Sequence, residues 1–349
     1  MVRRPTWAWI ALTHGILGIF GISVPGAAGL DHASYYELDD APHSETDGSC
    51  CESDCCCCVS DCCCCPLWTV TADALILDRS RAAPRVLYLD QFAQDAPAIN
   101  VDNLDPSTAA GPRISVIRHR PDRSDLEFTY FGIDGWNSQA GLSGASFQYA
   151  MNNLYGVSYD DIREIRLGYG SELSSFELNL RRQRNGWLTL LAGFRYLQLN
   201  ETFQITDWYN GPASRETFLT DTQNRLCGVQ IGADALLLQR GRLGVNALGK
   251  AGIYDNRSRE ASSYTYDRTA VTAKNNHAAF VGELAFTADY QLTPSLALRG
   301  GYQMMWIAGV ALAAEQIDST YLGVPPGALV NSSSDAFYHG AIVGLEYVR

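Results

Sequence analysis

The residues with the clearest chemical potential are cysteines, and ten of the eleven lie between Cys50 and Cys65. Thiols can form disulfides or, as thiolates, bind a soft metal ion. The spacing matches no zinc pattern, such as a C-x2-C pair repeated at a fixed interval. Adjacent cysteines bridge each other only with strain, so disulfides between blocks or between chains are favoured, while soft-metal binding and a plain low-complexity spacer stay open. The disulfide or cross-link candidates are Cys50, Cys51, Cys55, Cys56, Cys57, Cys58, Cys62, Cys63, Cys64 and Cys65.

A hydrolytic site would need a histidine beside an aspartate, serine or asparagine. The six histidines are His14, His32, His43, His119, His277 and His339. His277 comes nearest to such an arrangement, with Asp255 and Asp267 in adjoining segments. No spacing marks a nucleophile elbow or a metal site. We therefore expect no catalytic activity, no cofactor and no metal bound by these histidines, and a barrel hydrolase is the less favoured alternative.

The other polar residues are positioned by extended segments. From Leu67 onward, apolar and polar residues alternate with a period of two between polar breaks, which predicts about ten β-strands. The predicted strands are 68–79, 111–119, 124–135, 161–182, 187–206, 218–239, 242–257, 274–291, 295–312 and 335–348. Eight or twelve strands are the alternatives, because the long segment 161–182 contains Gly168-Tyr169-Gly170, where a turn could lie.

The breaks between these strands alternate between short turns and long loops. The short ones are 120–123, 183–186, 240–241 and 292–294, and Asn185-Gly186 is a strong hairpin signal. The long ones are about 80–110, 136–160, 207–217, 258–273 and 313–334. Bacterial transmembrane barrels have this asymmetry, with short periplasmic turns, long external loops and an even number of strands. The pattern therefore predicts an all-β fold, an antiparallel up-and-down transmembrane β-barrel.

Each predicted strand has one apolar row and one row that carries charges. In 218–239, for example, Cys227, Val229 and Ile231 alternate with Gln230 and Asp234. The lipid face of a barrel requires an apolar row, whereas charge is tolerated on the lumen face. The charged residues predicted to face the lumen are Asp73, Glu127, Glu177, Arg181, Arg195, Asp234, Lys250, Glu283, Asp289, Arg299 and Glu346.

Strand length and composition favour a membrane barrel over a soluble sandwich. Soluble strands mostly have about 5–6 residues, and a tilted strand needs about 9–11 to cross a bilayer; several predicted strands exceed both lengths. Charged residues make up only 18% of the chain, against about 25% in soluble proteins. Aromatic residues at strand ends are expected to form the interfacial girdles of a barrel. They are Trp68, Trp187, Trp208, Tyr209, Tyr254, Tyr290, Trp306 and Tyr347.

The first 28 residues have the features of a signal peptide. Arg3 and Arg4 precede a largely apolar stretch, and Pro25-Gly26-Ala27-Ala28 offers small residues for cleavage; an uncleaved anchor helix is the alternative. The expected organisation is a signal peptide at 1–28, a disordered cysteine-rich segment at 29–66 and a barrel at 67–349. The net charge of −12 argues against nucleic acid as a partner, because phosphate would repel the chain.

Several of these segments resemble a known family. Trp68–Arg79 is similar to the opening strand of the planctomycete Putative beta-barrel porin-7 proteins, and Ser171–Asn179, Leu191–Glu201 and Thr222–Gly232 are similar to later parts of them. The sequence Gly-Phe-Arg-Tyr within Leu191–Glu201 is the most specific part of a resemblance that spans about 67–349. This resemblance implies an outer-membrane barrel of a planctomycete with a porin-like role; it implies nothing about the cysteine blocks.

Three roles follow from these features. The inward charges could line a water-filled eyelet for small solutes, or pair with one another and fill the lumen. Filling is favoured, because open aqueous channels belong to barrels of about 16–18 strands. The third role is anchoring of the cell envelope through the cysteine segment. The expected partners are outer-membrane lipid, the barrel-assembly machinery, and copies of the chain or wall proteins joined by disulfides.

Overall fold

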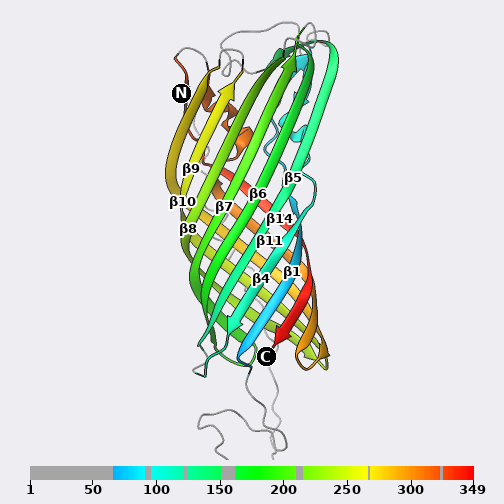
Figure 1. Ribbon diagram of the computed structural model, residues 1–349, viewed down its shortest axis with the longest axis vertical. Helices are drawn as coiled ribbons and strands as arrows, with labels where there is room; N and C mark the ends of the chain where they lie inside the picture. The colour runs from blue at the N-terminus through cyan, green and yellow to red at the C-terminus, as the bar shows by residue number, and fades with distance from the viewer. Residues whose placement is uncertain are drawn as a thin grey trace, which may run out of the picture. The chain divides into compact units, whose positions relative to one another are not determined.

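A closed antiparallel barrel dominates the computed structural model, in which residues 66–90, 96–121, 124–150, 162–209, 215–265, 268–322 and 325–349 are described. The predicted signal peptide and the ten clustered cysteines lie outside these residues. Each of ten long strands pairs with its neighbours, and the last pairs with the first (Figure 1). The barrel strands are β1 (Trp68–Arg79), β4 (Ala109–Arg118), β5 (Ser124–Tyr149), β6 (Ile162–Gln183), β7 (Leu188–Trp208), β8 (Arg215–Arg240), β9 (Leu243–Tyr264), β10 (Ala270–Thr293), β11 (Leu296–Val310) and β14 (Ser334–Val348).

The structure confirms the predicted ten-stranded antiparallel barrel and corrects several boundaries. Gly168 and Gly170 lie inside the continuous strand β6, so the counts of eight and twelve are wrong. The expected loops at 136–160 and 258–273 are wrong in part, because β5 continues to Tyr149, β9 continues to Tyr264 and β10 begins at Ala270. The outward side chains of these extensions are mostly polar, which makes the extensions look like loops in sequence.

A bulge in β5 explains why the sequence pattern indicates an earlier end to that strand. The pairing with β6 shifts between Ile133 and Trp136, and Gly135 has φ +98°. That backbone conformation suits glycine, since it has no Cβ. The bulge changes which residues face inward, and it directs the fully buried Trp136 into the barrel.

The short turns and both ends of the barrel lie at the same end of the molecule. The backbone N–H of Leu67 donates to the carbonyl oxygen of Arg349 at 2.6 Å, which brings the two ends together. The turns at 184–187, 241–242 and 294–295 join β6 to β7, β8 to β9 and β10 to β11 at this end. We call it the turn end, and the opposite one the far end.

A band of exposed apolar side chains surrounds the part of the barrel next to the turn end. Phe194, Ile231 and Ile253 are 66%, 69% and 68% exposed, far more than a core residue of a soluble protein. Beyond them toward the far end, the outward rows change to residues such as Gln198 and Arg225. A lipid bilayer covers a band of this kind. No helix among the described residues has the length and apolarity that crossing a bilayer requires.

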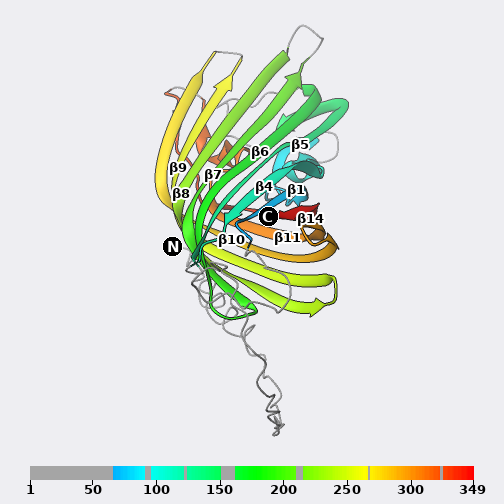
Figure 2. The ribbon, with the colours of Figure 1, turned by 60° about the horizontal axis from the view of Figure 1, so that its bottom comes forward.

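The six strands β5 to β10 continue past the apolar band. Shorter segments cover their inner side. Figure 2 shows β5 to β9 rising well beyond β1 and β14. The covering segments form the far-end cap, and its elements are β2 (Val86–Asp90), β3 (Ala96–Asn100), η2 (Val101–Asn103), η3 (Ala313–Asp318), β12 (Thr320–Tyr321) and β13 (Gly327–Ala328). The predicted long loops at 80–110 and 313–334 therefore contain secondary structure.

An apolar core joins the cap to the tall strands. Its buried residues from the cap include Leu87, Tyr88, Ile99, Ala314 and Ile317, and those from the strands include Phe147, Ile165, Leu167, Phe203, Ile205 and Phe218. A fully buried Leu, Ile or Phe side chain contributes about 1.5–3 kcal/mol relative to an exposed one. The cap is thus held to the wall as a packed structure.

A cluster of carboxylates and tyrosines lies at the edge of this core, outside the membrane-spanning part of the strands. Asp207 of β7 is opposite Glu216 of β8, and both are buried. The hydroxyl of Tyr88 lies 2.7 and 2.8 Å from the two carboxylate oxygens of Asp207, and that of Tyr149 donates to Oδ2 at 2.5 Å. Tyr264 donates to Glu216. Burial raises the pKa of Asp207 to about 7, although both tyrosine hydrogen bonds act to lower it.

This raised pKa predicts that the folded state is more stable at mildly acidic than at mildly alkaline pH. The ordinary pKa of aspartate is near 3.8, so the folded chain binds the extra proton between about pH 4 and pH 7. Stability from this group is therefore greatest near pH 4 and decreases as pH rises to about 7.

For the free energy of unfolding, we expect a loss of roughly 2–3 kcal/mol between pH 5 and pH 7 from Asp207. Thermal unfolding of the refolded protein in detergent at both pH values measures it. The Asp207→Asn variant is expected to lose most of this dependence, and an unchanged pH profile in that variant would rule out Asp207 as its source.

Candidate functional site in the barrel lumen

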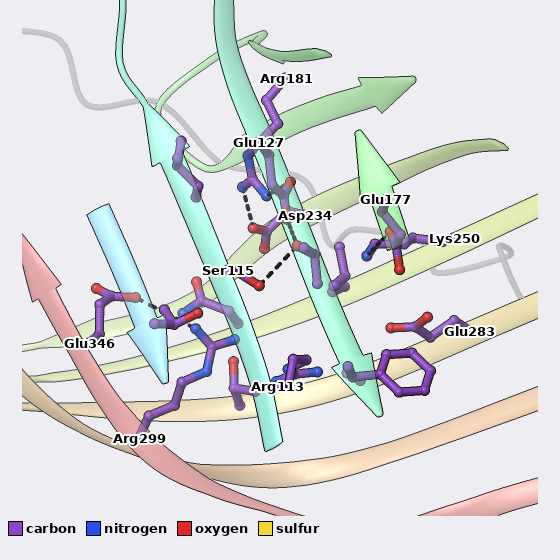
Figure 3. Close-up of a pocket in the computed structure, with 18 of the residues that line it drawn as sticks. Arg113, Ser115, Glu127, Glu177, Arg181, Asp234, Lys250, Glu283, Arg299 and Glu346 are labelled. Carbon is purple, nitrogen blue, oxygen red and sulfur yellow. Dashed lines mark hydrogen bonds and ion pairs between the residues drawn. The ribbon is translucent and has the colours of Figure 1, made fainter. Parts of the chain in front are cut away.

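The lumen contains a charged cavity next to the turn end. The cavity has a volume of about 200 Å³, and side chains from strands around the barrel point into it (Figure 3). Its charged lining residues are Arg113, Glu127, Glu177, Arg181, Asp234, Lys250, Glu283, Asp289, Arg299 and Glu346. We call this cavity the vestibule. Arg299 and Glu346 keep side-chain exposures of 19% and 26%, so solvent reaches it from the turn end.

Two arginines organise the rim of the vestibule. Arg181 forms ion pairs with Glu127 at 2.9 Å and with Asp234 at 2.6 Å. Arg299 lies among three carboxylates without touching any closely, at 3.5 Å from Glu346 and at 3.8–3.9 Å from Asp289 and Asp73. Separations of this length leave room for water-mediated contacts. The rim is therefore polar and only loosely packed around Arg299.

Deeper in the lumen, a second network is tightly packed and buried. The Arg195 guanidinium lies 2.9 Å from Glu283 and 3.5 Å from Glu177, and it donates to the Ser175 hydroxyl at 2.9 Å. Lys250 contributes a 2.9 Å pair to Glu177. The Arg195 side chain is 0% exposed, and those of Glu177 and Glu283 are 2% and 4% exposed. Such a network adds little net stability over an apolar core, but loss of one member leaves a buried charge without its partner.

A third ion pair involves Arg113, which is not among the predicted lumen residues. Arg113 of β4 donates to Oδ2 of Asp73 from two guanidinium nitrogens, at 2.6 and 3.0 Å, and to Gln303 at 2.8 Å. The alternation of residues along β4 is consistent with an inward Arg113, because the next residue, Ile114, is apolar and faces outward at 45% exposure. The apolar residues Val116 and Ile117 on opposite faces obscured that alternation.

On the far-end side of the ion pairs, apolar side chains fill the barrel. We call this layer the plug. Each of its main residues is at most 3% exposed, and they are Leu75, Leu77, Ile133, Trp136, Leu173, Leu197, Leu199, Leu226, Val281, Ile307 and Tyr338. The Trp136 ring packs against Tyr338 with centroids 5.1 Å apart, and its indole N–H donates to the carbonyl of Leu77 at 2.9 Å. The inward rows thus change from charged to apolar along the barrel axis.

Polar anchors hold the segment after β11 across the far side of the plug. Asn224 makes two 2.8 Å hydrogen bonds with the backbone of Ala311, one as donor and one as acceptor. Glu201 accepts the N–H of Ala313 at 2.9 Å and pairs with Arg79. The Arg79 guanidinium also lies 5.0 Å from the ring centroid of Tyr169. The segment that begins the cap is therefore fixed to the wall directly above the plug.

The predicted lumen residues lie inside the barrel in the structure. Asp73 and Arg195 are buried in the ion-pair networks, and the other nine border the vestibule. Lys250, Glu177 and Glu283 converge from three different strands, β9, β6 and β10, as Figure 3 shows. Sequence reasoning could assign the face of each residue, whereas the partners depend on the register between strands.

Among the histidines of the described part, His119 lies between a carboxylate and a hydroxyl: its Nδ1 is 2.8 Å from Asp125 and its Nε2 is 2.8 Å from the Thr69 hydroxyl, next to the turn end. The arrangement expected around His277 does not form. The Nε2 of His277 donates to the carbonyl of Gly309 at 2.6 Å, while the Asp255 side chain is exposed and pairs with Arg257. Asp267 lies outside the described residues. The described residues hold no group of three or more His, Cys, Asp or Glu placed to bind a metal ion. Cys227 is exposed on the outer face.

The expected aromatic girdle is correct only in part. Trp68, Trp187, Tyr290 and Tyr347 are 40–56% exposed and belong to the turn end of the apolar band. Tyr254, in contrast, is 2% exposed inside the lumen, where it donates to Gln230 at 3.2 Å. Trp208 lies at the far tip of β7, with Arg166 at 4.8 Å from its ring centroid. Both expectations were wrong. Tyr254 is on the inward row next to the outward Ile253. Trp208 and the neighbouring Tyr209, which donates to Glu216, lie beyond the bilayer crossing because β7 is longer than that crossing.

Solved structures of barrel proteins are similar to this chain in outline. The Escherichia coli outer membrane protease OmpT is 10% identical, with a TM-score of 0.47, over 81% of this chain and 96% of its own. The Pseudomonas putida toluene transporter TodX is 9% identical, with a TM-score of 0.28, over 80% of this chain and 88% of its own. The anion-selective porin of Comamonas acidovorans is 9% identical, with a TM-score of 0.19, over 81% of this chain and 100% of its own.

A protein-family model matches most of the barrel strands. No curated protein matches the sequence. The model of the family Putative beta barrel porin-7 (BBP7) matches residues 157–348, which include β6 to β11 and β14. This match covers more than half of the chain, and the chain belongs to the Putative beta barrel porin-7 family.

Proposed function

We propose that this protein is a structural component of a bacterial outer membrane, whose barrel crosses the membrane with a closed lumen. The observation that carries the proposal is the plug, in which Trp136, Tyr338 and Ile307 are all 0% exposed. Water and small polar solutes need a polar path, and a layer of fully buried apolar side chains does not offer one. The turn end would face the periplasm, as short turns do in this class of barrel.

The buried ion pairs below the plug support the same role. Arg195 and Lys250 each contact Glu177, which joins β7, β9 and β6 through the interior. These contacts connect strands that are not all neighbours in the barrel. A barrel with such internal cross-connections is expected to resist deformation in the membrane, which suits a structural component. We assign it no catalytic activity.

A passive pore for small solutes is the second candidate. The family description as a porin favours it, and so does the solvent-reached vestibule of about 200 Å³. In this alternative, the plug or the cap would have to rearrange to open a path. We also infer a planctomycete source and export by the signal peptide from the sequence features, with cross-linking through the cysteine segment as an addition compatible with either role.

Single-channel recording separates the two roles. The mature chain, residues 29–349, is refolded and inserted into planar bilayers, with and without residues 50–65. The structural role predicts insertion without steady conductance steps in both forms, with a large open porin as the positive control. Steady steps in both forms would reject the closed lumen and establish the pore. Thiol-sensitive species of high mass that disappear with the deletion would indicate cross-linking.

A further inference from the structure

A group of basic side chains lies on the outer wall of β8, β9 and β10. Arg225, Arg257, Arg259 and Lys274 are all exposed and belong to the outward rows of these strands. The same rows hold Val229 and Ile253 nearer to the turn end, at 56% and 68% exposure. We call the four residues the basic patch. It begins where the apolar band ends.

The strand register brings these charges directly beside one another. Arg225 is opposite Arg257 across β8 and β9, and Arg259 is opposite Lys274 across β9 and β10. Like charges in directly opposite positions destabilise a sheet. Within the described chain, Arg257 pairs with Asp255 at 3.3 Å, and no ion pair is present for the other three. The fold itself therefore gains nothing from this arrangement, and an external anion would relieve the repulsion.

The patch is confined to one side of the barrel. The outward rows of β1, β6 and β14 also leave the apolar band, but they reach Asp78, Glu172 and Asp335 there, which are all exposed. The whole chain has a net charge of −12. The outward rows of β8 and β9 also carry the exposed Asp221 and Asp255 beside the patch, so its four cations exceed these two carboxylates by two charges. On such an acidic chain this excess is a local exception, which points to an anionic partner on this side.

The height of the patch indicates what that partner is. Two residues along a strand advance about 6.6 Å, which gives about 5 Å of height for a strand tilted by about 35–45°. Arg225 is two residues from Cys227 on the outward row and Arg257 is level with it, so both guanidinium groups lie within the headgroup layer, which is about 5–7 Å thick on each side of the hydrocarbon. Arg259 and Lys274 lie about 5 Å further out, and their long flexible side chains reach back toward that layer. Phosphate is the anionic group of that layer, and guanidinium groups bind phosphate through paired hydrogen bonds.

We propose that the basic patch binds the phosphate-bearing headgroups of lipids in the leaflet around the far end of the barrel. Neighbouring strands are about 4.8 Å apart, so four cations on three strands can contact more than one phosphate group of a single large headgroup. The inference rests on the membrane-spanning part of the proposed function and is independent of whether the lumen is closed. Bound lipid would fix the protein's height and orientation in the membrane.

The test compares lipid binding by two matched double variants. Arg257→Gln/Arg259→Gln removes half of the patch, while Arg240→Gln/Arg242→Gln removes two exposed arginines at the turn end. The refolded proteins in nanodiscs of phosphatidylcholine are titrated with diphosphoryl lipid A, and bound lipid is counted by native mass spectrometry. We expect the patch variant to bind about tenfold or more weakly, since each basic side chain near an anionic surface contributes about fivefold. The turn-end variant should stay within about twofold of the wild type.

Two further measurements identify the source of the bound phosphate and check that the variants are folded. Inorganic phosphate at about 10 mM should not displace the lipid; complete displacement would make the patch a free-anion site and overturn the lipid assignment. Equal lipid binding by the wild type and the patch variant would also overturn it. Circular dichroism confirms that both variants are folded. If the barrel conducts ions and still binds lipid A through the patch, only the closed lumen is wrong. If the protein does not enter nanodiscs, the membrane-spanning role is wrong.

Discussion

Replacing Arg195 with alanine is expected to lower the free energy of unfolding by about 3–5 kcal/mol. The guanidinium is 0% exposed and holds Glu283 at 2.9 Å and Glu177 at 3.5 Å. Its removal leaves two carboxylates in the interior with Lys250 as the remaining cation nearby. Urea unfolding of the refolded barrel in lipid vesicles, followed by tryptophan fluorescence, measures the change.

Two further variants show whether this cost comes from the uncompensated charge. Arg299→Ala is the matched control, because Arg299 is partly exposed and its carboxylates lie 3.5–3.9 Å away; we expect a loss of about 1 kcal/mol or less. The double variant Arg195→Met/Glu283→Gln should recover part of the stability that Arg195→Ala loses, since it removes one of the two stranded charges. Equal losses for Arg195→Ala and Arg299→Ala would contradict a special role of the buried network.

Replacing Trp136 with alanine is expected to cost about 3–5 kcal/mol as well, through a different mechanism. The indole is 0% exposed in the plug, and the structure around a deleted core side chain relaxes only in part, which leaves a cavity. Trp136→Phe keeps much of the packing but leaves the carbonyl of Leu77 without its donor, at 2.9 Å in the wild type. We expect it to cost about 1–3 kcal/mol. The same urea titration measures both variants.

Trp187 provides the control for loss of a tryptophan as such. It is 56% exposed at the turn end, so Trp187→Ala should destabilise the barrel clearly less than Trp136→Ala. The order of the three variants is the decisive result. If Trp187→Ala proved as costly as Trp136→Ala, the interior would not be a packed plug, and the barrel would derive its stability from the lipid face.

The barrel itself could be predicted because its physical requirement is simple. A strand between lipid and lumen must alternate, so rows such as Val229, Ile231 and Ala233 against Gln230 and Asp234 reveal both strand and face. The requirement disappears beyond the bilayer. There the outward row of β9 becomes Asp255, Arg257 and Arg259, and the sequence resembles a loop although the strand continues to Tyr264.

The interior was harder to predict because it depends on register and on long-range contacts. Parity alone places Arg195 and Glu283 inside, but these residues are 88 positions apart in sequence, and their meeting depends on the pairing of the intervening strands. The plug was missed for a related reason. Leu197, Leu199 and Leu226 have the apolar character of a lipid face, and only the parity of Arg195 in the same row shows that the first two face inward.

The closure of the lumen is the central claim, and thiol labelling tests it most directly. Single cysteines replace Ser115 at the vestibule and Ala336, 1% exposed, in the plug. Both changes are made in a chain that lacks residues 50–65 and carries Cys227→Ser. A small charged thiol reagent is added to each refolded protein. We predict rapid labelling at position 115 and labelling at position 336 that is slower by roughly 100-fold or more, because it requires local opening. Similar rates at both positions would show a continuous aqueous path and contradict the closed barrel.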